Sequence, residues 1–118
     1  MILVDTSVWV DHLRSGNRTL VSLLERDEVL THPFVIGELA CGSIRNRREI
    51  LGLLATLPGA VMASHQDVIA LVDARRLFGR GIGWIYAHLL ASARLSHSGL
   101  ITLDSPLARA AALAGVSA

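Results

Sequence analysis

Two short segments near opposite ends of the chain share one pattern: an apolar run stops at an aspartate and passes into residues that begin helices. The first is Ile-Leu-Val-Asp-Thr-Ser at residues 2–7, and the second is Ile-Thr-Leu-Asp-Ser-Pro at residues 101–106. In a parallel α/β sheet such a pattern places a carboxylate at the carboxyl end of a strand, where these folds form ligand sites. We therefore expect Asp5 and Asp104 at one edge of a parallel sheet.

The rest of the chain alternates short apolar runs with segments of helical periodicity. Strands are expected at residues 2–5, 29–31 and 100–103, with a further candidate at residues 60–63. Helices are expected at residues 7–14, 18–26, 34–41, 46–57, 65–78, 84–96 and 106–114. This alternation predicts an α/β fold with a mostly parallel sheet, as a single domain over residues 1–118.

The apolar content, 52% of the 118 residues, is high for a domain of this size. No run approaches the roughly 18 uninterrupted apolar residues typical of a membrane helix, so no membrane association is expected. The high apolar content instead favours a surface that is covered by a second copy of the chain or by a partner. The start does not resemble a signal peptide, and the single cysteine, Cys41, excludes a disulfide within the chain. Both features predict a cytoplasmic protein.

All eleven basic residues are arginine, and the net charge is only +1. A GC-rich genome would explain the arginine usage without any function, whereas forked guanidinium groups also suit phosphate contacts. The small net charge argues against a protein that coats nucleic acid at large. Two arginine clusters, at residues 45–48 and 75–80, are either solvated helix faces or contacts to phosphate groups. Arg80, which lies in a glycine-rich segment, is the favoured candidate for such a phosphate contact.

Three carboxylates are candidates for chemistry. Asp5 has an alternative role as the N-cap of the helix that follows it. In the second segment Ser105 and Pro106 already form a cap and first-turn pair, so Asp104 is expected to have no structural role. Glu38 lies in an uncharged segment with apolar neighbours at helical spacing. A carboxylate in such surroundings needs a cation, a set of hydrogen bonds or a raised pKa.

Clustered carboxylates repel one another unless a cation neutralises them. Mg²⁺ or Mn²⁺ suits an all-oxygen ligand set, and such an ion can activate a water and stabilise charge on a phosphoryl oxygen. The acids therefore indicate metal-assisted phosphodiester hydrolysis. An aspartyl-phosphatase interpretation fails, because that chemistry usually places a second acid two residues after the first, where this chain has Ser7.

Five motifs are informative when they are taken together. They are Val-Asp-Thr-Ser-Val-Trp-Val-Asp at residues 4–11, Gly-Glu-Leu at 37–39, Gly-Arg-Gly-Ile-Gly-Trp at 79–84, Ala-His-Leu-Leu-Ala-Ser-Ala at 87–93 and Leu-Asp at 103–104. Over essentially the full length the chain resembles PIN-domain proteins, and specifically the VapC toxins of bacterial toxin–antitoxin pairs. The resemblance implies an α/β/α sandwich that forms a homodimer, cuts cellular RNA as a Mg²⁺-dependent endoribonuclease, and is inhibited by a cognate VapB-type antitoxin.

The resemblance also implies particular site residues. The family's acidic cluster corresponds to Asp5, Glu38 and Asp104, which would bind the metal ion and carry out catalysis. Thr6 and Thr102 correspond to polar positions that can form hydrogen bonds around these acids.

One position departs from that family's pattern. After Gly-Trp the family normally has a hydrophobic residue followed by Asp-Ala-His, whereas this chain has Ile85 followed by Tyr86, Ala87 and His88. Tyr86 therefore stands where a principal metal-binding aspartate is expected, and a phenol is neutral at pH 7 and a poor Mg²⁺ ligand. Two hypotheses follow: a toxin attenuated by this substitution, or a catalytically inactive scaffold that only dimerises and binds its antitoxin. We expect structural roles for His88 and Trp84.

Overall fold

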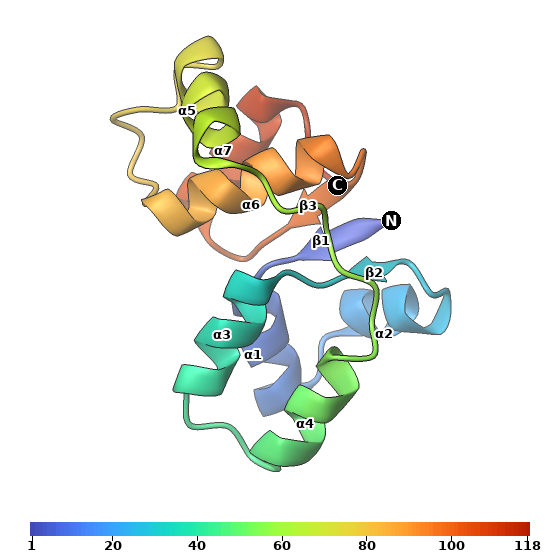
Figure 1. Cartoon of the computed structure of the whole chain (residues 1–118). Coiled ribbons are helices and arrows are strands. Elements are labelled where there is room, and N and C mark those ends of the chain that lie inside the picture. Colours follow the sequence, from blue (N-terminus) through green and yellow to red (C-terminus); the bar gives the residue numbers. More distant parts are fainter.

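A three-stranded parallel sheet lies in the middle of the folded molecule (Figure 1). The computed structural model describes residues 1–118. The strands are β1 (Ile2–Val4), β2 (Val29–Leu30) and β3 (Gly99–Ile101), in the order β2-β1-β3. Strand β1 pairs with β3 along its whole length, from Ile2 with Gly99 to Val4 with Ile101. Their carboxyl ends therefore lie side by side.

Helices cover both faces of this sheet, as Figure 1 shows. One side carries α1 (Thr6–Ser15), α2 (Arg18–Glu25), α3 (Pro33–Cys41) and α4 (Arg47–Leu54). The other side carries α5 (His65–Ala74), α6 (Trp84–Leu95) and α7 (Ser105–Ala114). The predicted α/β/α sandwich with a parallel sheet is confirmed. The longest helix, α6, has 12 residues, and none of the helices has the length and apolarity needed to span a membrane.

Covering the sheet on both sides explains why its strands are apolar runs. Leu3 and Val4 of β1 and Leu100 of β3 are almost completely buried. Parallel strands with two covered faces have this continuous apolar character rather than alternation. A cluster of 26 buried hydrophobic residues forms one core around the sheet.

The strand considered at residues 60–63 is absent, and that expectation is wrong. Pairing with the sheet is limited to a single bridge between Thr31 and Gly59, beside which the Ala60 N–H donates to the Thr31 carbonyl at 2.8 Å. The partner strand ends there, because His32 caps α3 and Pro33 begins it. No further length of β2 is available for pairing.

Two helices are shorter than their apolar periodicity indicates. Helix α5 ends at Ala74 rather than near residue 78, because Arg76 adopts a left-handed backbone conformation with φ of 53°. Helix α4 begins at Arg47 and ends at Leu54, three residues short of Leu57. Leu57 precedes a proline, and the residue before proline disfavours the helical conformation.

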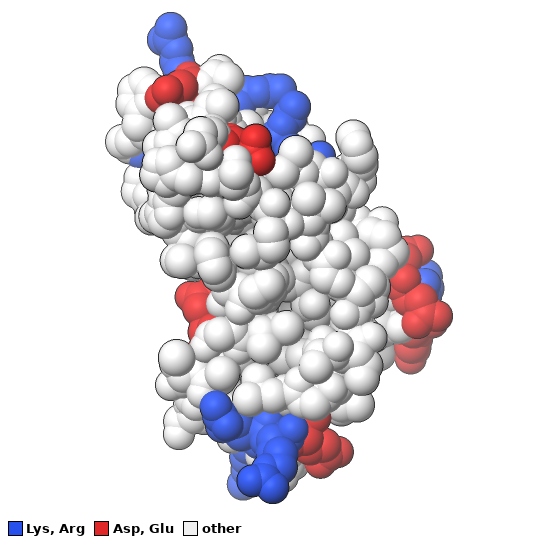
Figure 2. Space-filling model, in the orientation of Figure 1, with Lys and Arg blue, Asp and Glu red and all other residues white.

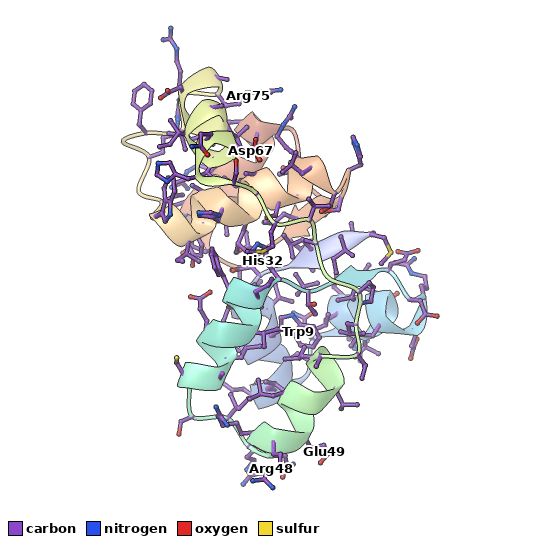
Figure 3. The ribbon with its side chains drawn as sticks, viewed as in Figure 1. Trp9, His32, Arg48, Glu49, Asp67 and Arg75 are labelled. Carbon is purple, nitrogen blue, oxygen red and sulfur yellow. The ribbon has the colours of Figure 1, made fainter.

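His32 connects the two halves of the molecule (Figure 3). It is fully buried at the N-terminus of α3, where its Nδ1 accepts the Phe34 N–H at 3.0 Å. Its Nε2 lies 3.0 Å from the Ser92 hydroxyl of α6. The helix that carries Glu38 is therefore joined to the helix that carries Tyr86.

Candidate active site

Asp5 follows β1 directly and is completely buried at the carboxyl edge of the sheet. Its N–H donates to the Ile101 carbonyl of β3 at 3.0 Å, which continues the strand pairing by one step. Its Oδ2 accepts the hydroxyls of Ser7 and Thr102, both at 2.7 Å, and the Ser7 N–H at 3.4 Å. One carboxylate oxygen thus receives three hydrogen bonds.

The other oxygen, Oδ1, is buried and has no hydrogen-bond partner. Buried polar atoms are almost always satisfied, so an orphaned carboxylate oxygen in a folded protein needs an explanation. Asp5 also caps α1, which was the alternative role considered for it. Capping uses only Oδ2, and it leaves Oδ1 free for a cation.

Asp104 caps α7, contrary to the expectation that it has no structural role. Its Oδ2 accepts the Leu107 N–H at 3.0 Å, and its backbone is extended while Ser105 is already helical. Its own N–H donates to the Thr102 hydroxyl at 3.0 Å. Thr102 therefore contacts both Asp5 and Asp104, and it places the two acids at one edge of the sheet.

Glu38 lies on the exposed face of α3, so the expectation of apolar surroundings is wrong. The neighbouring Gly37 and Cys41 are exposed as well, because the apolar segment is more extensive than the part of the helix that is buried. The Thr6 hydroxyl donates to Glu38 Oε1 at 2.8 Å. This contact brings Glu38 next to the start of α1, one residue beyond Asp5.

The pKa of Tyr86 is affected by all three acids. The pKa of its phenol is raised above the usual 10, first by burial and then by the negative charges of Asp5, Asp104 and Glu38. A charge influences a pKa in this way only over short distances. All three carboxylates therefore lie near enough to act on this half-buried phenol, which stays neutral at physiological pH.

These acids do not form a ready-made metal centre. No three Asp, Glu, His or Cys side chains in the chain lie close enough together to hold one ion. The oxygen donors and the orphaned Asp5 oxygen fit a hard divalent cation in kind. They fall short in proximity, because the three carboxylates are not drawn together into one group.

Ser7 is a site residue that we did not single out from the sequence. Its hydroxyl donates to Asp5 Oδ2 and accepts the Leu103 N–H at 2.9 Å, so it joins the start of α1 to the segment after β3. Its place two residues after Asp5 was the available signal. We considered that place only for a second acid.

Arg80, the RNA-binding candidate, lies in the exposed loop between α5 and α6. Its Nε donates to the Arg76 carbonyl at 2.6 Å. The next residue, Gly81, lies beside Pro106 at the start of α7, close in sequence to Asp104. Arg80 is therefore anchored in a loop that borders the acids.

The structural roles expected for His88 and Trp84 agree with their packing. His88 is buried, and the rings of Trp84 and Phe34 pack edge-on against it at 4.9 and 5.1 Å between centroids. His65 also packs against Trp84, with 5.1 Å between the ring centroids. His88 Nδ1 has no partner, and burial followed by the charge of His65 lowers its pKa. This imidazole is therefore neutral and belongs to an aromatic cluster.

Comparison with known proteins gives the same picture. Residues 2–113 match the family model of the PIN domain. Over 118 residues the chain is 49% identical to "Ribonuclease VapC32" of Mycobacterium tuberculosis, in strain CDC 1551 / Oshkosh and in strain ATCC 25618 / H37Rv. Each match covers 99% of this chain and 95% of the relative. The chain therefore belongs to the PIN-domain family and is a member of its VapC type.

Proposed function

We propose that this protein is the toxin of a type II toxin–antitoxin pair, a divalent-metal-dependent endoribonuclease whose activity is reduced by Tyr86. The observation that carries the proposal is the hydroxyl network at this edge of the sheet: Thr102 contacts both Asp5 and Asp104, and Thr6, the residue after Asp5, bonds Glu38. Neighbouring carboxylates supply the oxygen donors that a hard cation prefers. The relatives' name, ribonuclease, supplies the reaction class.

Asp5, Glu38 and Asp104 would hold Mg²⁺ or Mn²⁺. When bound, such an ion supplies activation of a water and stabilisation of negative charge on the scissile phosphate. The surrounding hydroxyls fix the carboxylates: Ser7 and Thr102 hold Asp5 Oδ2, and Thr6 holds Glu38 Oε1. Each carboxylate is thereby oriented with one oxygen left free.

Tyr86 weakens this site through charge and through size. A neutral phenol at this position removes one unit of negative charge relative to an aspartate, and its raised pKa keeps it protonated. Its ring also occupies space beside the acids. Affinity for the divalent ion, and with it the rate of RNA cleavage, is therefore lower than in a chain with aspartate at this position.

The proposed partners are cellular RNA as substrate, a VapB-type antitoxin as inhibitor and a second copy of the chain, all in the cytoplasm. Apolar side chains near the acids support a covered surface: Trp84, Ile85 and Leu103 are 42%, 38% and 59% exposed. Large apolar side chains grouped on a surface commonly mark an interface.

The test compares Tyr86→Asp with Tyr86→Asn, two variants of nearly equal size that differ in charge. We expect Tyr86→Asp to bind Mg²⁺ by calorimetry and to cleave RNA, and Tyr86→Asn, which removes the ring without adding charge, to gain much less of both. Adding Asp5→Asn to the Tyr86→Asp chain should abolish both gains. If Tyr86→Asp gains neither metal binding nor cleavage, attenuation by Tyr86 is wrong.

The second candidate is an inactive scaffold that only dimerises and binds its antitoxin. The lack of any three-ligand group favours it. For this candidate we expect two results: the chain binds its antitoxin, and Tyr86→Asp restores neither Mg²⁺ affinity nor RNA cleavage.

A further inference from the structure

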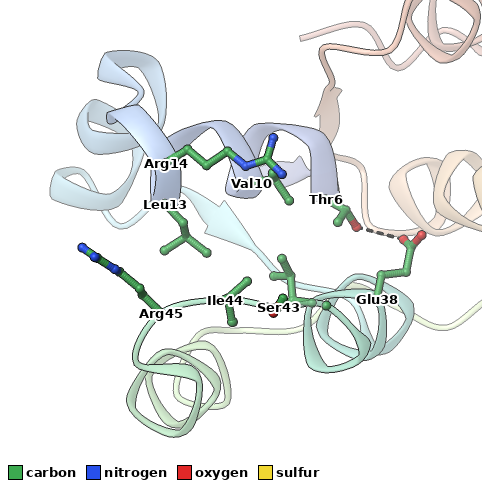
Figure 4. A pocket seen from close by; sticks show the side chains of 10 residues that line it. Thr6, Val10, Leu13, Arg14, Glu38, Ser43, Ile44 and Arg45 are labelled. Carbon is green, nitrogen blue, oxygen red and sulfur yellow. Dashed lines mark hydrogen bonds between the residues drawn. The ribbon is translucent and has the colours of Figure 1, made fainter.

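A cavity of about 420 Å³ opens next to the acids, between α1 and the end of α3 (Figure 4). Thr6 and Glu38 line one end of it, joined by their hydrogen bond. Arg14 and Arg45 also line it. The cavity thus extends from the proposed cleavage site toward two basic side chains.

The α1 wall of this cavity follows from helical spacing. Thr6, Val10 and Arg14 are four residues apart, so they share one face of the helix. Eight residues of helix correspond to about 12 Å along the axis. Figure 4 shows the Arg14 side chain running back along α1 toward Val10 and Thr6. Its charge therefore lies over the cavity between the two ends.

Neither arginine is neutralised within the chain. The single salt bridge joins Arg26 to Glu28, and neither the Arg14 nor the Arg45 guanidinium has a hydrogen-bond partner. Glu38 is the only acidic residue that lines the cavity, and it is already bonded to Thr6. Figure 2 shows basic side chains gathered at the α4 end of the molecule. The cavity therefore has two free cationic groups on one side of the acids.

We propose that this cavity binds the RNA strand on one side of the scissile bond, with Arg14 on a phosphate close to the cut and Arg45 on one further along. The proposal rests on the proposed function and adds the path of the substrate. Forked guanidinium groups suit phosphate oxygens. The apolar floor formed by Val10, Leu13 and Ile44 would pack against sugars and bases.

Continuity with the acids favours RNA over an acidic polypeptide as the occupant. The Thr6–Glu38 contact belongs both to the cavity and to the proposed metal site, so a strand held by Arg14 leads directly to the acids. On the other side of the acids, Arg80 lies in the loop beside the start of α7. Basic groups on both sides of the acids match a phosphate chain that passes across them.

The test measures binding of fluorescein-labelled eight-nucleotide oligo-U and oligo-A RNAs by anisotropy, without divalent metal, over a series of salt concentrations. The variants are Arg14→Ala, Arg45→Ala and their combination, with Arg109→Ala on α7 as the matched control. For single strands each lost phosphate contact lowers the slope of log affinity against log salt by about 0.7. We expect that decrease for each single variant, on both RNAs, and an affinity about tenfold weaker for the double variant.

Arg109→Ala should leave the affinity for RNA and the salt slope unchanged. A ten-residue polyglutamate peptide should not displace the labelled RNA. If both single variants retain the parent slope, or if polyglutamate displaces RNA as well as unlabelled RNA does, the proposal is overturned. RNA cleavage by the Tyr86→Asp chain separates the two questions. If Arg14→Ala and Arg45→Ala leave this cleavage unchanged, the RNA path through the cavity is wrong and the proposed nuclease function still stands. If they raise KM for RNA without changing kcat, both the path and the function are supported.

Discussion

Thr102 Oγ1 lies 2.7 Å from Asp5 Oδ2, although 97 positions separate the two residues in the chain. The Ser7 hydroxyl lies 3.2 Å from the same Thr102 oxygen and also bonds Asp5. Three side chains from the ends of β1 and β3 thus form one network. It fixes the buried carboxylate in an orientation that leaves its second oxygen without a partner.

Removing the Ser7 hydroxyl tests the strength of this network. Ser7→Ala deletes a hydrogen bond to Asp5 and leaves the Leu103 N–H without its acceptor. We expect the free energy of unfolding to fall by about 1–3 kcal/mol, the range for a lost hydrogen bond to a charged group, because the exposed Leu103 N–H can bond water instead. Ser22→Ala on the exposed side of α2 is the control and should change it by less than about 0.5 kcal/mol. Equal denaturation midpoints for the two variants would contradict this role of Ser7.

The influence of the acids on Tyr86 can be measured through the pKa of its phenol. Tyr86 is the only tyrosine in the chain. Ultraviolet absorbance of the phenolate therefore reports its pKa without interference from other tyrosines. Burial and three negative charges raise that pKa above 10, so ionisation should begin at higher pH than in a model peptide. Removing one charge with Asp5→Asn or Glu38→Gln should lower the pKa toward 10.

The control is Asp73→Asn, which removes a charge from the exposed side of α5. It should leave the phenol titration where it is in the parent chain. If Asp5→Asn and Glu38→Gln shift the titration no more than Asp73→Asn does, these acids do not raise the pKa of Tyr86.

The order of elements could be predicted from the sequence because each is marked locally. Apolar runs ending at Asp5 and Asp104 indicated two of the three strands, and helical periodicity indicated the helices between them. The segment at residues 60–63 failed because strand formation requires a partner. Only the folded chain shows that β2 ends after Leu30 and offers one bridge at Thr31.

The candidate site could be predicted only in part. Residue type and position indicated that Asp5 and Asp104 meet, since both follow parallel strands. The exposure of Glu38 and the capping role of Asp104 depend on how far a helix is covered and on where its first turn closes. Neither is a property of a residue and its immediate neighbours. Thr102 and Ser7 acquire their roles through contacts across 95 to 97 positions, which local patterns do not contain.

Replacing Tyr86 by an acid should also change stability in the absence of metal. A fourth carboxylate beside Asp5, Glu38 and Asp104 adds like-charge repulsion of about 1 kcal/mol, equivalent to a pKa shift of about one unit. We expect metal-free Tyr86→Asp to melt below Tyr86→Asn, which loses the same ring contacts without adding charge. Mg²⁺ should reverse the order by binding only the folded acid variant. A metal-free Tyr86→Asp chain that melts at or above the temperature of Tyr86→Asn would contradict the repulsion.

His32 should make the fold sensitive to acid. Burial, followed by the nearby charge of His88, lowers its pKa from 6.5 to about 4. In the folded chain its Nδ1 accepts the Phe34 N–H and its Nε2 contacts Ser92, so a proton on Nδ1 would break the cap of α3. As pH falls the unfolded chain therefore binds the proton first. The contribution of His32 to stability is complete above pH 6.5 and is lost between about pH 6.5 and 4.

The shift corresponds to a loss of about 3 kcal/mol across that range. His32→Asn keeps a side chain that caps helices but does not titrate, so its stability should decline less steeply between pH 6.5 and 4. His97→Asn is the matched control, because His97 is exposed and its left-handed backbone, with φ of 51°, tolerates asparagine. Urea unfolding at each pH gives the free energy of unfolding of the parent chain and of each variant. In the difference between parent and variant, the contributions of all other titrating groups cancel. Parallel curves for the parent chain and His32→Asn would show that His32 is not held neutral by the fold.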